Sequence, residues 1–328
     1  MASTSARIAT RACGFLSKRV VSRLLKLAIT VIVLTVAARY IQPEKIFSTI
    51  LSVHPVFLMG AVFMLIPNLF LQQVKWLLLL RRIDANASSI AAWHSLLAGY
   101  PLGLATPGRW GELGRALFLP DYPRTTVAAL AAIDKILNFA AIVLLGVSGA
   151  ALFLNDELLP KVFIDPTIIF AIVVFLFAGI LFSKKILKKF LNRNGARVQS
   201  SSWIGVMHKL DAKFLFILFM LSLFFVITFC AQLLILVEGL QPVDVPRGFA
   251  AASATFLTQS LLPLSIGDLG VRESAAAFFF SKIGVAPQAA FSAALLLFII
   301  NMLLPSVAGL FLLWKNPSKP RQHRAPLP

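Results

Sequence analysis

The segment "ATPGRWGELGRALF", which runs from Ala105 to Phe118, places ionisable side chains between strongly apolar stretches of the chain. Arg109 and Arg115 lie on either side of Glu112, and the i,i+3 spacing of Glu112 and Arg115 puts both on one face of a helix. An arginine guanidinium binds phosphate or carboxylate through two parallel hydrogen bonds. The segment therefore predicts either the binding of an anionic group or an ion pair that holds the segment together.

A second segment of this kind, "LPLSIGDLGVRESAA", carries Asp268, Arg272 and Glu273. Here too, a glycine-rich turn precedes an arginine that has carboxylate neighbours. A helix that begins after such a turn exposes backbone amides and the positive end of its dipole, which favour an anion. Two such segments facing one cavity would bind the headgroup of a phospholipid or a polyprenyl phosphate. In the alternative, each arginine pairs with its carboxylate neighbour only to hold the turn together.

A further charged pair, Asp134 and Lys135, lies inside the apolar run Thr126 to Leu154. Asp134 is placed to accept a proton or to pair with Arg115, and Lys135 to extend to the cytoplasmic surface. The alternative for these two residues is an ordinary ion pair near the end of a helix. Asn301, midway along the last apolar run, is expected to form an interhelical hydrogen bond.

No group of residues in the sequence predicts catalysis, a metal site or a cofactor. His94 has no neighbours of ligand type, and Cys13 and Cys230 are far apart, the second inside an apolar run. No nucleotide-binding loop and no set of Ser, His and Asp is evident. We therefore expect no catalytic residues, no metal and no cofactor, and an energy source other than ATP.

The segments that must position these charges are strongly apolar. Hydrophobic residues make up 59% of the 328 residues, charged residues only 13%, and the mean hydropathy is +0.86. Runs such as Val20 to Ala38, Val56 to Leu80 and Phe214 to Val237 match the roughly 20 residues that cross a bilayer as a helix. The net charge of +18 comes from lysines and arginines clustered between such runs, where they set topology and meet anionic lipid headgroups. Nucleic acid is therefore not a predicted partner.

The basic residues beside the apolar runs predict the orientation, because lysine and arginine in short loops stay in the cytoplasm. Residues 1–26 carry only basic charges, and the loop Ser183 to Lys213 is rich in lysine, so both are placed inside. The acidic segment Asn155 to Asp165 is placed outside. A cleaved signal peptide is the alternative for the N-terminus, but a retained first span is favoured.

A single complete crossing between Ser88 and Leu119 is inconsistent with this orientation, because it would place the lysine-rich loop outside. The first hairpin, residues 88–119, is instead predicted to enter from the cytoplasm, break and return. A second hairpin, residues 249–283, is predicted to enter from outside and to break at Pro263 and Gly267. The residues predicted to break the first hairpin are Gly99, Pro101, Gly103, Pro107 and Gly108.

The two hairpins belong to two similar halves of the chain. At a constant shift, Val56 falls near Ala212, Ser88 near Asp244, and the letters "GELG" on "GDLG". An odd number of crossings in each half would give the halves opposite orientations, and paired interrupted helices in such inverted repeats point to a binding site near the bilayer midplane. The alternative is a chance similarity of two glycine-rich turns.

The predicted fold is an all-α polytopic membrane protein with about six full spans and two re-entrant hairpins in an inverted repeat. Residues 1–19 form a basic cytoplasmic N-terminus, 20–154 the first repeat and 155–313 the second. Residues 314–328 form a basic, proline-rich cytoplasmic tail, which is predicted to be disordered.

At the two hairpins the sequence resembles the transmembrane region of the lysylphosphatidylglycerol synthases, also described as flippase-like membrane proteins. The more specific of the two matching motifs is "LGVRE", from Leu269 to Glu273. The chain departs from the family at Asp134 and Lys135, where members often carry glutamate and arginine, and near Phe298, where they carry an arginine. The other motif is matched by Pro107, Gly111, Glu112, Arg115 and Leu119.

The resemblance implies a lipid-handling membrane protein. We expect it in a bacterial inner membrane, and the basic residues beside the first and last spans place both termini in the cytoplasm. The favoured function is translocation of an anionic phospholipid or lipid-linked substrate through a cavity between the hairpins, alongside a separate lipid-synthesis enzyme. No synthase domain follows the last span, so aminoacyl transfer by this chain is not expected. The alternative function is a membrane-embedded lipid-modifying enzyme or accessory subunit, with Glu112 or Asp268 as its base.

Overall fold

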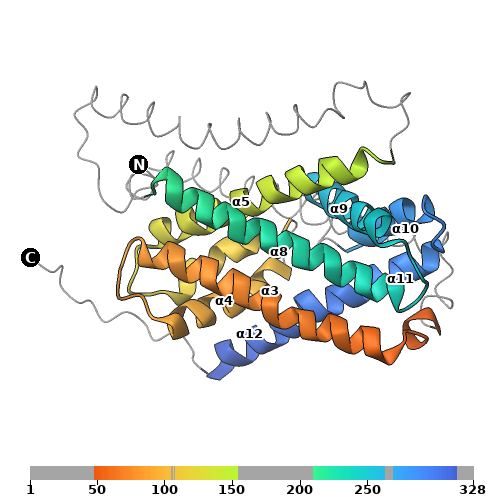
Figure 1. Ribbon diagram of the computed structural model, residues 1–328. Helices are drawn as coiled ribbons and strands as arrows, with labels where there is room; N and C mark the ends of the chain where they lie inside the picture. Colours follow the sequence, from red (N-terminus) through yellow and green to blue (C-terminus); the bar gives the residue numbers. More distant parts are fainter. Residues whose placement is uncertain (1–47, 105, 107, 154–209, 263–268, 316–328) are drawn as a thin grey trace, which may run out of the picture.

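A computed structural model of the protein describes residues 48–104, 106, 108–153, 210–262 and 269–315, and every regular element within these residues is helical (Figure 1). The predicted first span and the predicted span before the lysine-rich loop lie outside the described residues. The elements are α3 (Pro55–Arg81), α4 (Ser89–Leu104), η1 (Trp110–Phe118), α5 (Arg124–Ala150), α8 (Ala212–Glu238), α9 (Val245–Leu261), α10 (Val271–Ser281), α11 (Pro287–Phe298), η3 (Ile299–Leu303) and α12 (Leu304–Lys315).

Four of the predicted spans are confirmed as long apolar helices. The helices α3, α5 and α8 have 27 residues each, and α11, η3 and α12 run on as one helix. At a rise of about 1.5 Å per residue such helices exceed the roughly 30 Å of a bilayer core. One side of α3 remains exposed and apolar in the described structure, as a surface in contact with lipid requires: Val56, Met59, Phe63, Ile66 and Phe70.

Both predicted hairpin regions form two helices separated by a break. The first arms, α4 and α9, have 16 and 17 residues, which is short for a complete crossing, and η1 packs back on α4 as α10 does on α9. The predicted position of the first break is wrong in part, because α4 continues through Gly99, Pro101 and Gly103 to Leu104. The tip of the second hairpin, including Asp268, lies outside the described residues.

Helices α3 and α8 lie side by side and run in opposite directions (Figure 1). At one end of the pair, Arg82 forms an ion pair with Asp211. At the other end, the backbone N–H of His54 donates to the carbonyl of Gly239 at 2.9 Å. The two halves also follow the same order: a long helix, a hairpin of two short helices, and a second long helix.

Helices of one half pack closely on helices of the other. A Cβ atom added to Gly149 of α5 would lie 2.1 Å from Ser253 Oγ of α9, and one added to Gly309 of α12 would lie 2.2 Å from the carbonyl oxygen of Leu97 of α4. Small residues thus allow α5 to contact the second hairpin and α12 to contact the first.

A neutral polar cluster joins α3, α8 and the last span. The Asn301 amide donates to Gln232 Oε1 at 2.8 Å, and the Asn68 amide donates to the same oxygen at 2.6 Å. The interhelical hydrogen bond predicted for Asn301 is therefore confirmed. Asn301 lies in η3, a π-helical turn, and such turns often mark functional or strained positions.

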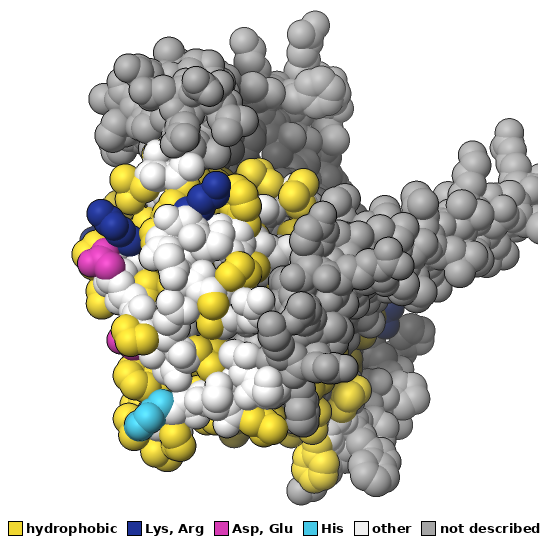
Figure 2. Space-filling model, turned by 90° about the vertical axis from the view of Figure 1, so that its right-hand side faces the viewer, with side chains coloured by type: hydrophobic (Ala, Val, Ile, Leu, Met, Phe, Trp, Pro, Cys, Tyr) yellow, Lys and Arg dark blue, Asp and Glu magenta, His cyan; other side chains and the backbone are white. Residues whose placement is uncertain are grey.

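The two ends of the helix bundle differ in charge. The end at the right of Figure 1, seen face on in Figure 2, shows mainly hydrophobic and uncharged side chains in its described part. In the part of the chain that the structure describes, the opposite end carries more basic side chains. The basic residues at that opposite end are Arg81, Arg82, Arg124 and Lys213.

A hydrogen bond between two loops makes stability depend on pH. The Tyr122 hydroxyl donates to Asp84 Oδ2 at 2.7 Å. Partial burial and this bond raise the pKa of Tyr122 to about 12, and the bond lowers the pKa of Asp84 below its ordinary value. Because the pKa of Tyr122 is raised, the tyrosine stabilises the fold fully below about pH 10, and this contribution is lost as the pH rises toward 12. Because the pKa of Asp84 is lowered, the aspartate stabilises the fold at neutral pH, and this contribution is lost when the pH falls below the pKa of Asp84 in the folded protein.

We therefore expect Tyr122→Phe to lower the melting temperature at pH 8 and to have almost no effect at pH 12 or well below pH 4. Thermal unfolding in detergent, with wild type beside the variant at each pH, measures this difference. An equal difference at pH 8 and pH 12 would show that the hydrogen bond is not its source.

Candidate functional site

The turn of the first hairpin brings its charged side chains back against α4. Gly108 and Arg109 both have left-handed backbone, with φ of 58° and 56°, and such a conformation is uncommon for a residue other than glycine. The Oγ1 atom of Thr106 accepts a hydrogen bond from Gly111 N at 2.6 Å. The chain then continues as the 3-10 helix η1, which is unusually long for this helix type.

Two glycines of α4 create the space in which the charged side chains of η1 lie. A Cβ atom added to Gly99 would be 2.8 Å from Cγ of Arg115, and one added to Gly103 would be 2.8 Å from Cγ of Glu112. These glycines were predicted to break the helix. Their role in the structure is instead to let Arg115 and Glu112 lie directly on the α4 backbone.

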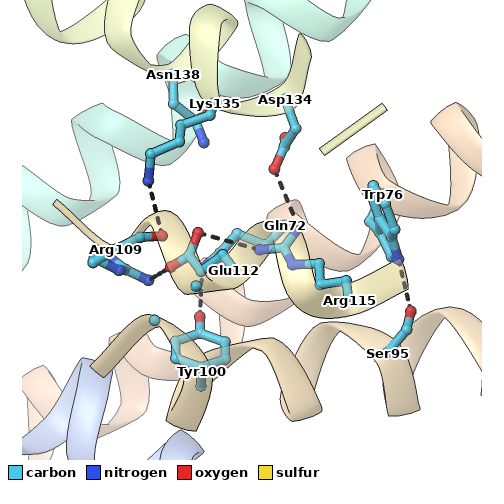
Figure 3. A network of polar contacts seen from close by, with 12 residues as sticks. Gln72, Trp76, Ser95, Tyr100, Arg109, Glu112, Arg115, Asp134, Lys135 and Asn138 are labelled. Carbon is cyan, nitrogen blue, oxygen red and sulfur yellow. Dashed lines mark hydrogen bonds and ion pairs between the residues drawn. The ribbon is translucent and has the colours of Figure 1, made fainter. Parts of the chain in front are cut away.

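Five charged side chains form a sequence of alternating sign, which we call the charge chain: Arg109, Glu112, Arg115, Asp134 and Lys75. Arg109 pairs with Glu112, whose Oε2 lies 3.5 Å from Nη2 of Arg115. Arg115 Nη1 lies 3.3 Å from Asp134 Oδ2, and Asp134 Oδ1 lies 2.8 Å from Lys75 Nζ. Figure 3 shows how η1 directs this chain toward α5. The predicted pairs of Arg115 with Glu112 and with Asp134 are both present.

Lys75 is the member of the site that sequence reasoning missed. It was counted within the apolar run of α3, yet its side chain is 1% exposed and contacts two other helices, α5 and α8, through an ion pair and hydrogen bonds. It donates to Asn138 Oδ1 and, at 3.0 Å, to Ser222 Oγ. The signal was a lysine preceded by two glutamines inside a predicted span, since ionisable residues at that depth are rare and usually functional.

Lys135, which was predicted to extend to the cytoplasmic surface, lies against the first hairpin. Its ammonium group donates to the carbonyl of Arg109 at 3.2 Å and lies 5.8 Å from the centre of the Trp110 ring. Asp134, its neighbour in sequence, points instead to Arg115 (Figure 3). Lys135 thus contacts Arg109 at the start of η1, and Asp134 contacts Arg115 further along η1.

Aromatic and polar side chains of α3 and α4 fix the two arginines. The Arg115 guanidinium lies 5.2 Å from the centre of the Trp76 ring, and Trp76 Nε1 donates to Ser95 Oγ at 2.8 Å. The Arg109 guanidinium lies 5.7 Å from the Tyr100 ring, whose hydroxyl accepts from the Gln72 amide (Figure 3). Such contacts restrict the orientation of each guanidinium and are expected to stabilise a cation out of water.

The second hairpin holds a smaller charged group. Arg272 pairs with Glu273, and Glu273 Oε2 accepts from Gly270 N at 2.7 Å, which caps the start of α10. The Arg272 guanidinium also lies 5.5 Å from the Phe298 ring of α11. Within the described residues no ion pair or hydrogen bond joins Arg272 to the charge chain. The predicted common cavity between the hairpins therefore stays a prediction.

Arg115 of the first hairpin and Arg272 of the second each retain an unused hydrogen-bond donor. In the part of the chain that the structure describes, Nε of Arg115 and Nε of Arg272 are buried and have no acceptor. Arg115 is only 3% exposed. A buried donor without an acceptor costs about 1–3 kcal/mol, so these atoms are suited to an anionic oxygen.

The long apolar helices and the buried charge chain define a helical integral membrane protein. Residues 23–309 match the family model described as the lysylphosphatidylglycerol synthase TM region. The chain belongs to this family, which confirms the resemblance seen at the two hairpins and indicates a membrane protein of lipid metabolism or transport. No curated protein gives a significant match to the chain.

Proposed function

We propose that the protein binds the anionic headgroup of a phospholipid or lipid-linked molecule at the first hairpin and moves it across the membrane. The observation that carries this proposal is the charge chain, whose members are buried or partly buried at a helix break between apolar spans. A charged side chain at membrane depth costs several kcal/mol unless it is paired or hydrated. A family of lipid metabolism or transport is consistent with a lipid as the ligand.

The net charge of the side chains at the first hairpin is positive and favours the binding of an anion. Within the described part of the site, the cationic side chains of Arg109, Arg115, Lys75 and Lys135 outnumber the carboxylates of Glu112 and Asp134. A phosphate would restore the balance of charge and accept a hydrogen bond from the buried Nε of Arg115. Arg272 and Glu273, together with Asp268, are proposed to contact the same headgroup from the second hairpin.

Translocation, rather than binding alone, is proposed from the relation of the two halves. Their elements follow one order, and the corresponding helices α3 and α8 are antiparallel, as an inverted repeat requires. Inverted repeats allow alternating access to a site at the repeat interface. We propose this arrangement in a bacterial inner membrane, with both termini in the cytoplasm and a separate enzyme supplying the lipid.

The test is transfer of a labelled anionic lipid between the leaflets of vesicles that contain the purified protein. Wild type is expected to move the lipid without changing its mass. Arg115→Lys keeps the charge but loses the two-pronged donor, so transfer is expected to fall about tenfold or more at equal protein level. Reduction of fluorescent lipid in the outer leaflet measures transfer, and mass spectrometry measures chemical change.

Arg124→Lys provides the matched control, because Arg124 is exposed at the start of α5. This control should transfer lipid like wild type. The proposal is wrong if wild-type vesicles transfer no more anionic lipid than empty vesicles. A product of altered mass would favour the lipid-modifying enzyme instead.

A further inference from the structure

The two halves contain corresponding polar pairs at the same places in their helices. Counted from the first residue of each helix, Lys75 of α3 corresponds to Gln232 of α8, and Asn138 of α5 corresponds to Asn301 of the last span. Lys75 donates to Asn138, and Gln232 accepts from Asn301 at 2.8 Å. The same contact between a first long helix and a second long helix is thus made twice.

The corresponding pairs differ in charge. By the same count, Asp134 in the first half corresponds to Leu297 in the second, and Leu297 is fully buried. The second half therefore has Gln232 and Leu297 where the first half has Lys75 and Asp134. Two uncharged residues, both fully buried, occupy these places in the second half, so the fold alone does not require an ion pair in the first.

The ion pair between Lys75 and Asp134 determines how much of the positive charge of Arg115 is available to a ligand. Asp134 lies between Lys75 and Arg115 and contacts both. If Lys75 were uncharged, the Asp134 carboxylate would have Arg115 as its only cationic partner within the charge chain, and the positive charge that Arg115 offers to a ligand would be largely cancelled. The ammonium group of Lys75 is already held by Asp134, Asn138 and Ser222, whereas Nε of Arg115 has no acceptor in the described structure, so Arg115 is the group placed to bind a headgroup.

We infer that Lys75 is a positioning residue that sets the charge selectivity of the site: it offsets the negative charge of Asp134, and more of the positive charge of Arg115 is then left to attract an anionic headgroup. This inference rests on the proposed function and adds to it the residue that makes the site prefer anionic over zwitterionic lipids. It also assigns the preference for anionic lipids to the first half, because the second half has uncharged residues at the places of Lys75 and Asp134.

The test compares the binding of phosphatidylglycerol and phosphatidylcholine to full-length protein in detergent, read by native mass spectrometry. Lys75→Gln copies the residue of the second half and is expected to lower the preference for phosphatidylglycerol about tenfold, as the loss of one neighbouring cation implies. Lys75→Arg keeps the charge and should keep the preference.

The double variant Lys75→Gln with Asp134→Leu distinguishes a role in charge from a role in folding. It copies both residues of the second half and removes one charge of each sign, so the preference for phosphatidylglycerol should return to near that of wild type. Gln232→Met changes the corresponding position outside the charge chain and should leave the preference unchanged. Each variant is compared at equal amounts of monodisperse protein.

The outcomes separate this inference from the proposed function. No preference for phosphatidylglycerol in wild type would overturn the proposed function. A wild-type preference that survives Lys75→Gln, or that the double variant fails to recover, would overturn the role of Lys75 and leave the proposed function standing. A preference lost in Lys75→Gln and recovered in the double variant would support both.

Discussion

Asp134→Leu is expected to destabilise the folded protein by about 3–5 kcal/mol, because it removes the carboxylate that partners two buried cations. Among the described residues, Lys75 would keep only its neutral partners, Asn138 and Ser222, and Arg115 would keep Glu112 as its one carboxylate. A buried charge without a counter-ion is far more costly than the absence of the whole pair. Thermal unfolding in detergent, followed by size-exclusion chromatography, measures the loss.

Asp121→Leu serves as the control, since Asp121 is exposed in the loop before α5, and it should change stability little. Adding Lys75→Gln to Asp134→Leu should recover much of the lost stability, because the second half already holds glutamine and leucine at the corresponding places. Equal stability of wild type and Asp134→Leu would show that Asp134 does not stabilise these cations.

Gly111→Ala is expected to destabilise the first hairpin by about 1–3 kcal/mol, near the upper end of this range. The added methyl group would lie 1.9 Å from the carbonyl oxygen of Leu102, a backbone atom that cannot turn aside. The arms α4 and η1 would have to separate, which would also move Glu112 and Arg115 off the α4 backbone. Lower thermal stability and lower lipid transfer should therefore appear together.

Gly60→Ala is the matched control for this prediction. A Cβ atom at Gly60 would meet only Ile235 Cγ2, at an ordinary contact distance of 3.7 Å, and alanine favours helix over glycine. This variant should be as stable as wild type or slightly more so. If Gly111→Ala were equally well tolerated, the close packing of the hairpin arms would be refuted.

The spans and the two hairpin regions were predictable because each depends on the composition of a short stretch of sequence. Long apolar runs need no tertiary information to be recognised as membrane helices, and short helical arms flanked by glycine and proline indicate a break. The position of the first break was less predictable. Gly99 and Gly103 carry the same composition signal as a turn, but they serve the packing of Arg115 and Glu112 inside a continuous helix.

The sequence predicted only those members of the charge chain that lie near one another in the sequence. Glu112 and Arg115 followed from helical spacing, and Asp134 was considered as a partner of Arg115. Lys75 was overlooked because an average over the apolar run conceals one lysine. Its contact with Ser222 joins residues far apart in sequence, and no periodicity within one helix reports such a contact.

The close packing between the halves also bears on how the protein is synthesised. Translation delivers α3, α4 and α5 to the membrane before their partners exist. Ser222, which accepts from Lys75, arrives only with α8, and Gly309, which closes against Leu97, arrives only with α12. Until then, among the described residues, Lys75 has only its partners within the first half, Asp134 and Asn138. The two halves therefore mature as one unit, because α12, which is synthesised long after the first hairpin, completes the packing of that hairpin.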